Sequence, residues 1–246
     1  MKIAIVTSEV TYIPYNYNKL ILALVENHSV SLLVNLKNKS PMLYLKGIVL
    51  YLYGAKKIGA QLIKNNFFTR STIRKETCQA HNVEFLEANS MNEPQIIQEL
   101  KNKKIDIILN IRTRCIYKEE ALKLTKLGCI NLHHGILPNY RGTMCDLYAI
   151  EEGRKPGFTI HKMEKKVDAG LIFETYESNY QGKDYWEYLS LSHKDELIKI
   201  NELISFVQKN QQLPNGTINS RNKDTTYTKN PSKQKIKEML KKGMIL

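Results

Sequence analysis

The sequence predicts an α/β fold in which an open, mostly parallel, twisted sheet has helices on both faces. The first observation is the start of the chain, where apolar runs at 2–7 and 29–34 flank a segment of helical spacing at 17–27. Two buried strands joined by a helix form a β-α-β unit, which is typical of parallel sheets. The second observation is composition, because 246 residues, 42% of them hydrophobic, suffice for one large core. Together they indicate a Rossmann-like sheet.

The later elements continue this alternation. Short strands are expected at 83–86, 105–111, 129–132, 158–163 and 170–174, the last two as an antiparallel extension. Helices are expected at 94–101, with Asn92 as N-cap, and at 119–127, closed by Gly128. Residues 1–180 therefore form the main domain.

Two segments stand apart from this pattern. Residues 43–66 are apolar but interrupted by lysines, so we expect a helical insertion packed on the domain rather than a membrane span. A helix on a membrane surface or against a partner is the alternative. Residues 181–246 form a C-terminal extension with a helix, a hairpin turn at 214–216 and a basic tail. That tail, from 229 onward, is expected to be a solvated basic helix or a frayed end, with a binding element as the alternative.

The net charge and the cysteine content limit which classes of protein this chain can belong to. The formal net charge is +13, so the surface attracts anions, whether nucleic acid, an anionic membrane or a small phosphate-bearing substrate. The four cysteines are well separated and match neither a zinc site nor a disulfide framework. The first residues read as a strand rather than a signal peptide, so a cytoplasmic location is expected.

Three polar side chains follow predicted strands. Asn131 and His133 stand at the carboxyl end of strand 129–132, and Asp168 lies in a Val-Asp-Ala-Gly turn. In open α/β sheets, ligands bind at the carboxyl ends of the strands. An amide binds a developing oxyanion, an imidazolium stabilises or protonates it, and a carboxylate orients the imidazole. The trio therefore predicts an enzyme in which an amine attacks a carbonyl carbon.

These residues resemble the hallmark of the formyltransferases that use N10-formyltetrahydrofolate. That hallmark reads Asn-x-His-x-Ser-x-Leu-Pro, followed by an Asp in a Val-Asp-Ala/Thr-Gly turn. The matching pieces here are Asn131, His133, Leu137, Pro138 and the turn 167–170. Two positions depart from it, since Gly135 replaces the Ser and His134 stands where Pro is common.

The resemblance implies roles for individual residues. Asn131, His133 and Asp168 match the catalytic trio, and no metal is expected. The pterin of the co-substrate is expected to contact Arg112, Arg114, Ile116, Tyr117, Met163 and Val167. The acceptor is expected to contact Ser8, Glu9, His134, Tyr140 and Arg141, since Arg is well suited to phosphate.

The resemblance also narrows the choice among possible formyl acceptors. Methionyl-tRNA formyltransferases have a second, β-rich domain, for which 181–246 is short, and glycinamide ribonucleotide formyltransferases have a glycine-rich turn that 7–14 lacks. Sugar N-formyltransferases, which act on nucleotide-linked amino-deoxysugars for bacterial surface polysaccharides such as O-antigen, are the best match. We expect a dTDP-linked 4-amino-4,6-dideoxyhexose, with UDP or GDP sugars close behind.

The partners follow from this assignment. The hairpin turn at 214–216 favours a homodimer, and neither nucleic-acid binding nor stable membrane insertion is expected. Two alternatives stay open. One is a methionyl-tRNA formyltransferase-like enzyme, and the other is a degenerate, non-catalytic scaffold that binds RNA or membrane.

Overall fold

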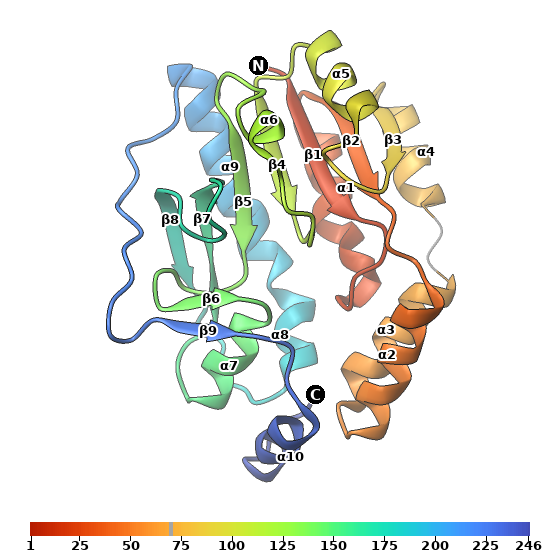
Figure 1. Ribbon diagram of the computed structural model, residues 1–246, viewed down its shortest axis with the longest axis vertical. Coiled ribbons are helices and arrows are strands. Elements are labelled where there is room, and N and C mark those ends of the chain that lie inside the picture. Colours follow the sequence, from red (N-terminus) through yellow and green to blue (C-terminus); the bar gives the residue numbers. More distant parts are fainter. Residues whose placement is uncertain (69–70) are drawn as a thin grey trace.

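The computed structural model describes residues 1–68 and 71–246, which are built around a seven-stranded sheet (Figure 1). The strands lie in the order β3-β2-β1-β4-β5-β7-β8. Their bounds are β1 Ile3–Ser8, β2 Val30–Leu36, β3 Glu84–Ala88, β4 Ile107–Ile111, β5 Cys129–His133, β7 Gly157–Lys162 and β8 Ile172–Glu177. Strands β1 to β5 are parallel, and β7 pairs antiparallel with both β5 and β8. The predicted mostly parallel α/β sheet is therefore confirmed.

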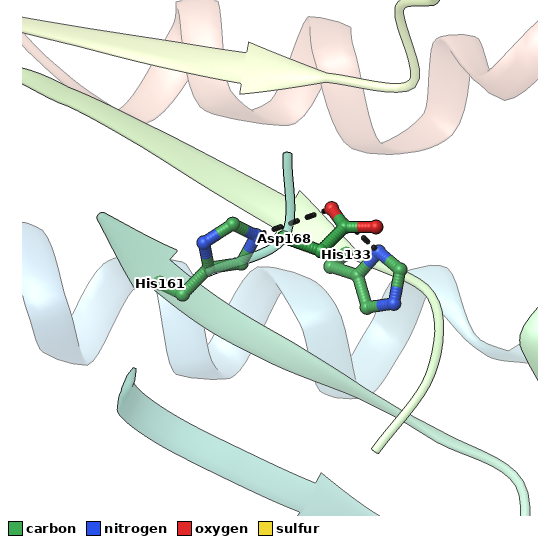
Figure 2. Close-up of side chains that lie close together, drawn as sticks. All are labelled: His133, His161 and Asp168. Atoms are coloured by element: carbon green, nitrogen blue, oxygen red, sulfur yellow. Dashed lines mark ion pairs between the residues drawn. The ribbon is translucent and has the colours of Figure 1, made fainter. Parts of the chain in front are cut away.

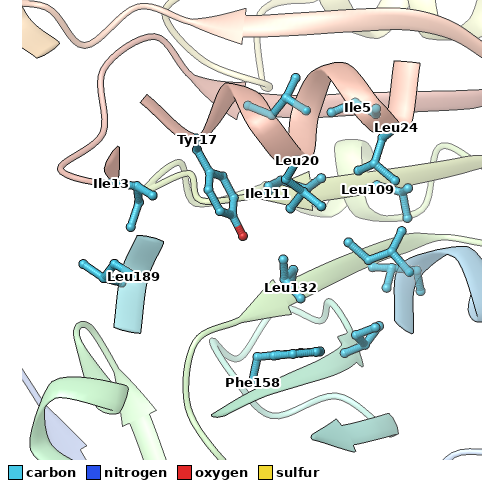
Figure 3. Packing of buried hydrophobic residues seen from close by; sticks show 14 of the residues in the cluster. Ile5, Ile13, Tyr17, Leu20, Leu24, Leu109, Ile111, Leu132, Phe158 and Leu189 are labelled. Atoms are coloured by element: carbon cyan, nitrogen blue, oxygen red, sulfur yellow. The ribbon is translucent and has the colours of Figure 1, made fainter. Parts of the chain in front are cut away.

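Helices cover both faces of the sheet because its strands bury alternate residues on opposite sides. In β1, Ile3 and Ile5 belong to one apolar cluster, whereas Ala4 and Val6 belong to the other. The first cluster, part of which is drawn in Figure 3, is covered by α1 (Asn18–Asn27), α4 (Thr72–Ala80), α8 (Tyr185–Leu191) and α9 (His193–Asn210). The second is covered by α5 (Pro94–Asn102) and α6 (Glu119–Leu122). Residues of the C-terminal extension thus share the core of the sheet.

The insertion predicted at 43–66 is helical but consists of two helices. They are α2 (Pro41–Leu52) and α3 (Lys56–Phe68), which pack side by side as a hairpin. The helices approach closely at Gly59, where an added Cβ would lie 2.7 Å from the carbonyl oxygen of Gly47. The inner residues Ile58 and Leu62 are buried, whereas Met42 on the outer side is 74% exposed. Among the described residues, no helix is long and apolar enough to cross a membrane.

The carboxyl ends of the parallel strands are covered by elements from distant parts of the chain (Figure 1). These are the short 3-10 helix η1 (Pro14–Tyr17), the two-stranded sheet of β6 (Tyr140–Gly142) and β9 (Thr226–Thr228), α7 (Cys145–Glu151) and α10 (Lys233–Lys241). Helix α10 buries Ile236 and Met239, while Lys235 pairs with the buried Glu151 at 2.7 Å. The basic tail is therefore a docked amphipathic helix and not a frayed end.

Three local predictions are wrong. The helix expected at 119–127 ends at Leu122, because the hydroxyl of Thr125 closes a turn on the carbonyl oxygen of Gly128. Asn92 is not the N-cap of α5, since its side chain instead bonds the backbone of Ile116 and Lys118. The turn at 214–216 does not join two paired strands; Thr217 bridges to Ile172 of β8. The ground for expecting a homodimer is thereby removed.

Candidate active site

The site begins with a row of polar side chains across three neighbouring strands. The sheet register pairs Asn110 of β4 with Asn131 of β5, and Asn131 with His161 of β7. Residues paired in this way point to the same face of a sheet. The two-residue period of β5 brings His133 to that face as well, while Leu132 points into the core on the other side.

Both neighbours orient the Asn131 amide. Its Oδ1 accepts a hydrogen bond from Nδ2 of Asn110 at 2.8 Å, and its Nδ2 donates to Nε2 of His161 at 3.1 Å. His161 accepts there because its Nδ1 donates to the carbonyl oxygen of Lys162 at 2.8 Å. One N–H of Asn131 therefore remains to bind an oxyanion, with its direction already fixed.

The carboxylate of Asp168 lies between two imidazoles (Figure 2). Its Oδ1 is 3.5 Å from Nδ1 of His133 and 3.8 Å from Nε2 of His161. Nε2 of His133 donates to the carbonyl oxygen of Tyr140 at 3.0 Å, so Nδ1 is the ring nitrogen that faces Asp168. Burial lowers the pKa of His161 to about 4 and the neighbouring His133 adds to this effect, so His161 is neutral near pH 7.

The same three side chains have the spacing of a metal site. One ligand atom from each of His133, His161 and Asp168 lies within 4.8 Å of the others. However, Nε2 of His161 already accepts from Asn131, so its lone pair is committed to a hydrogen bond. The donor set therefore fits acid–base chemistry better than metal binding, and the expectation of no metal stays a prediction.

The turn that carries Asp168 is held in place by Arg141. The backbone of Asp168 has a φ of 51°, a left-handed conformation that needs support from its surroundings. The guanidinium of Arg141, only 1% exposed, donates to the carbonyl oxygen of Asp168 and to Oδ1 of Asn219 at 2.7 Å. The N–H of Gly142 donates to the Asp168 carboxylate at 2.9 Å. Both terminal nitrogens of Arg141 thus donate inside the protein, and its buried Nε has no hydrogen-bond partner among the described residues, so the structure does not support the expected contact with the acceptor.

The predicted catalytic trio faces one cavity of about 420 Å³. All six side chains expected to contact the pterin line it, namely Arg112, Arg114, Ile116, Tyr117, Met163 and Val167. Of the expected acceptor residues, His134 lines this cavity and Ser8 lines a second, adjoining one. Glu9 and Tyr140 lie outside both cavities. Tyr140 is buried with its hydroxyl bonded to Glu152, so it is not an acceptor contact.

His134, which departs from the family hallmark, is the centre of a buried charged cluster. Its Nε2 is 2.9 Å from Glu196 of α9, its Nδ1 is 3.1 Å from Asp146 of α7, and Arg112 contacts the same ring. Burial by itself would raise the pKa of Glu196, but His134 and Arg112 lower it to about 2. Tyr17 also donates to Glu196. The cluster fixes Arg112 where the two cavities meet.

The other departure, Gly135, has a packing reason. A Cβ at this position would lie 2.5 Å from Cβ of Cys145 and 3.0 Å from Nε2 of His133. Cys145 opens α7 and is fully buried. The first turn of this helix therefore occupies the space that a serine side chain would need.

Sequence reasoning missed Asn110 and Glu196, although both left a signal. Asn110 is a polar residue inside a run of β-branched residues, in a strand buried on both faces. Glu196 precedes Ile200, Leu203 and Val207 by 4, 7 and 11 positions, so a charge lies on the apolar stripe of α9. Buried charges at such positions are nearly always paired.

Comparisons with known proteins identify the family of this chain. The formyl transferase family matches residues 37–181. A methionyl-tRNA formyltransferase of Thermotoga maritima is 31% identical over 153 residues, which is 61% of this chain and 47% of that protein. The bifunctional polymyxin resistance protein ArnA of Wigglesworthia glossinidia brevipalpis is 32% identical over 144 residues, 57% of this chain and 22% of that protein. The chain spans about half the length of the methionyl-tRNA formyltransferases it matches.

Solved structures share the fold. A phosphoribosylglycinamide formyltransferase from Anaplasma phagocytophilum superposes with a TM-score of 0.62 at 16% identity, covering 92% of this chain and 97% of that one. A 4-N formyltransferase from Francisella tularensis superposes with a TM-score of 0.57 at 17% identity, covering 92% and 75%. With a family match over more than half of its residues, this chain belongs to the formyl transferase family.

Proposed function

We propose that this chain transfers the formyl group of N10-formyltetrahydrofolate to the amino group of a nucleotide-linked amino-deoxysugar. The proposed acceptor is a dTDP-linked 4-amino-4,6-dideoxyhexose used for a bacterial surface polysaccharide. The observation that carries the proposal is the set of Asn131, His133 and Asp168 at one cavity, the first two supplied by β5 and the third by the turn between β7 and β8. The residues fit a folate there, because Ile116 and Val167 are 70% and 59% exposed at this cavity, where a planar ring would cover them.

In this proposal each catalytic side chain has one task. Asn131 donates its second N–H to the formyl oxygen as that oxygen gains negative charge. His133 stabilises the same charge from the Nδ1 side of its ring. Asp168 keeps the imidazole oriented and accepts the proton released by the attacking amine. This proton passes to N10 when the bond between N10 and the formyl carbon breaks and tetrahydrofolate leaves. His161, neutral near pH 7, acts as a positioning residue for Asn131.

A sugar acceptor is favoured over tRNA by the shape of the acceptor side. The second cavity, about 560 Å³, adjoins the first and is closed on one side by the α2–α3 hairpin. A cavity of this size suits a small molecule. Methionyl-tRNA is the second candidate, because methionyl-tRNA formyltransferases are among the relatives that are 31% identical to this chain.

The test is formyl transfer from N10-formyltetrahydrofolate to a panel of acceptors, followed as tetrahydrofolate release. The panel contains dTDP- and UDP-linked amino sugars, glycinamide ribonucleotide and methionyl-tRNA. Turnover with an amino sugar supports the proposal, whereas turnover with methionyl-tRNA alone replaces it by the second candidate.

The same assay tests the site. Asn131→Ala removes one oxyanion donor, which costs about 2.7–4 kcal/mol, or roughly 10²–10³ in kcat. We expect a comparable loss for His133→Ala, with tetrahydrofolate affinity kept in both variants. His81→Ala, at an exposed histidine, is the matched control. If Asn131→Ala or His133→Ala retained most of its turnover, the assignment of catalytic residues would be wrong.

A further inference from the structure

The second cavity has two different kinds of wall. It lies between the loop after β1, the α2–α3 hairpin and the segment at 230–231. Apolar side chains form most of its lining, among them the aliphatic Val10, Ile13, Leu43, Val49, Leu50, Ile58 and Leu62. Tyr12, Arg112, Arg114 and Met144 line both cavities, so the two spaces meet at these side chains. A ligand seated in the second cavity therefore reaches the catalytic trio through this junction.

Three cations face this cavity: Lys46 of α2, Arg112 and Arg114. Arg112 has anionic neighbours in the buried Asp146 and Glu196. The other two do not, because within 1–68 and 71–246 neither Lys46 nor Arg114 forms an ion pair with a carboxylate. Arg114 donates to the neutral amide oxygen of Asn230 at 3.3 Å.

Lys46 and Arg114 also repel each other. Burial lowers the pKa of Lys46, and the nearby charge of Arg114 lowers it further. Like charges at the wall of a cavity, without an opposing carboxylate, are unfavourable until an anion binds between them. A ligand with two adjacent phosphates meets this need, since both side chains are good phosphate donors.

We infer that the second cavity is the acceptor site and that Lys46 and Arg114 bind the diphosphate of the acceptor. The aliphatic wall then covers the apolar part beyond the phosphates, and the amino sugar enters the first cavity. This inference rests on the proposed function and makes it more specific. It assigns a binding role to the inserted hairpin, because Lys46 reaches the cavity only through α2.

A diphosphate of this kind has two sources. A nucleoside diphosphate places its base against the aliphatic wall. A lipid diphosphate runs its chain out of the cavity along α2, where Met42 and Leu45 are 74% and 52% exposed. Both share the same anchor on Lys46 and Arg114, and they differ only in the group attached to the phosphates.

The test is isothermal titration calorimetry of the full chain with dTDP, UDP, inorganic pyrophosphate and farnesyl diphosphate, without folate or sugar. We expect dTDP to bind and Lys46→Met to weaken this binding at least tenfold, while Lys46→Arg stays within threefold of the parent. Lys56→Met is the matched control, because Lys56 is an exposed lysine of the same hairpin and lines neither cavity. Tetrahydrofolate affinity should be the same in all variants, which also reports correct folding.

The outcomes separate this inference from the proposed function. Equal dTDP affinity in the parent and in Lys46→Met, or no binding by any of the four probes, overturns the inference whatever the activity. Stronger binding of farnesyl diphosphate than of dTDP supports the diphosphate anchor and assigns it to a lipid-linked acceptor. If binding depends on Lys46 but no amino sugar is formylated, the diphosphate site on Lys46 and Arg114 is supported and the proposed reaction is refuted.

Discussion

Asn110 offers a sharp test of the site because it touches neither the acceptor nor the formyl group in the proposed reaction. Its Oδ1 accepts hydrogen bonds from the hydroxyls of Thr113 at 2.7 Å and Tyr117 at 2.9 Å. These two donors fix which end of the Asn110 amide faces Asn131. The Nδ2 of Asn110 therefore donates to Oδ1 of Asn131 at 2.8 Å.

The substitution Asn110→Asp keeps the shape of the side chain and inverts this one contact. Thr113 and Tyr117 still donate to one carboxylate oxygen, so the other oxygen faces the carbonyl of Asn131. Two acceptors now oppose each other on one side of Asn131, whereas Nε2 of His161 still accepts on the other side. Neither orientation of the Asn131 amide satisfies both neighbours, so its N–H is no longer held toward the oxyanion.

The expected cost equals the loss of one preorganised oxyanion donor, about 2.7–4 kcal/mol, which lowers kcat roughly 10²–10³-fold. Single-turnover formyl transfer measures this step directly, and tetrahydrofolate affinity should change little. Asn222→Asp, at an exposed asparagine, controls for the added charge. A kcat within threefold of the parent would refute the argument that Asn110 orients Asn131.

Three further predictions concern stability. Because the pKa of His161 in the folded protein, about 4, lies below its ordinary value of 6.5, the unfolded chain takes up a proton first as the pH falls. About 3 kcal/mol of stability should therefore be lost between pH 6.5 and 4 in urea unfolding; His161→Gln should flatten this dependence and His81→Gln should not. Arg141→Met removes the donor to the buried carbonyl oxygen and the amide oxygen of Asn219, at about 1–3 kcal/mol each, so its urea midpoint should fall; an unchanged midpoint argues against this role. Gly135→Ser forces a side chain against Cys145 and should cost about 1–3 kcal/mol in the same urea unfolding; an unchanged midpoint would refute this packing argument.

The strands of the sheet were predictable because short apolar runs bounded by turn residues rarely form anything other than buried strands in a chain of this composition. Most predicted strands lie within two or three residues of the observed ones, including those at β1 and β5. Their register was not predictable. The sequence identifies Asn131 and His133 through a resemblance, but the pairing of Asn110 with Asn131 depends on how β4 slides against β5. That single alignment decides which amide orients Asn131, the proposed oxyanion donor.

Arg141 and Lys46 illustrate why binding residues are harder to predict than catalytic ones. Arg141 follows the hallmark directly, and an arginine beside a catalytic turn predicts a contact with a substrate anion. Instead, the guanidinium of Arg141 donates to the oxygens of Asn219, which lies 78 positions away in the sequence. Lys46 lies in an insertion without any motif, yet the α2–α3 hairpin brings it to a cavity wall beside Arg114. The function of a cation is set by the acceptors it meets, and those acceptors come from segments that only the tertiary fold brings together.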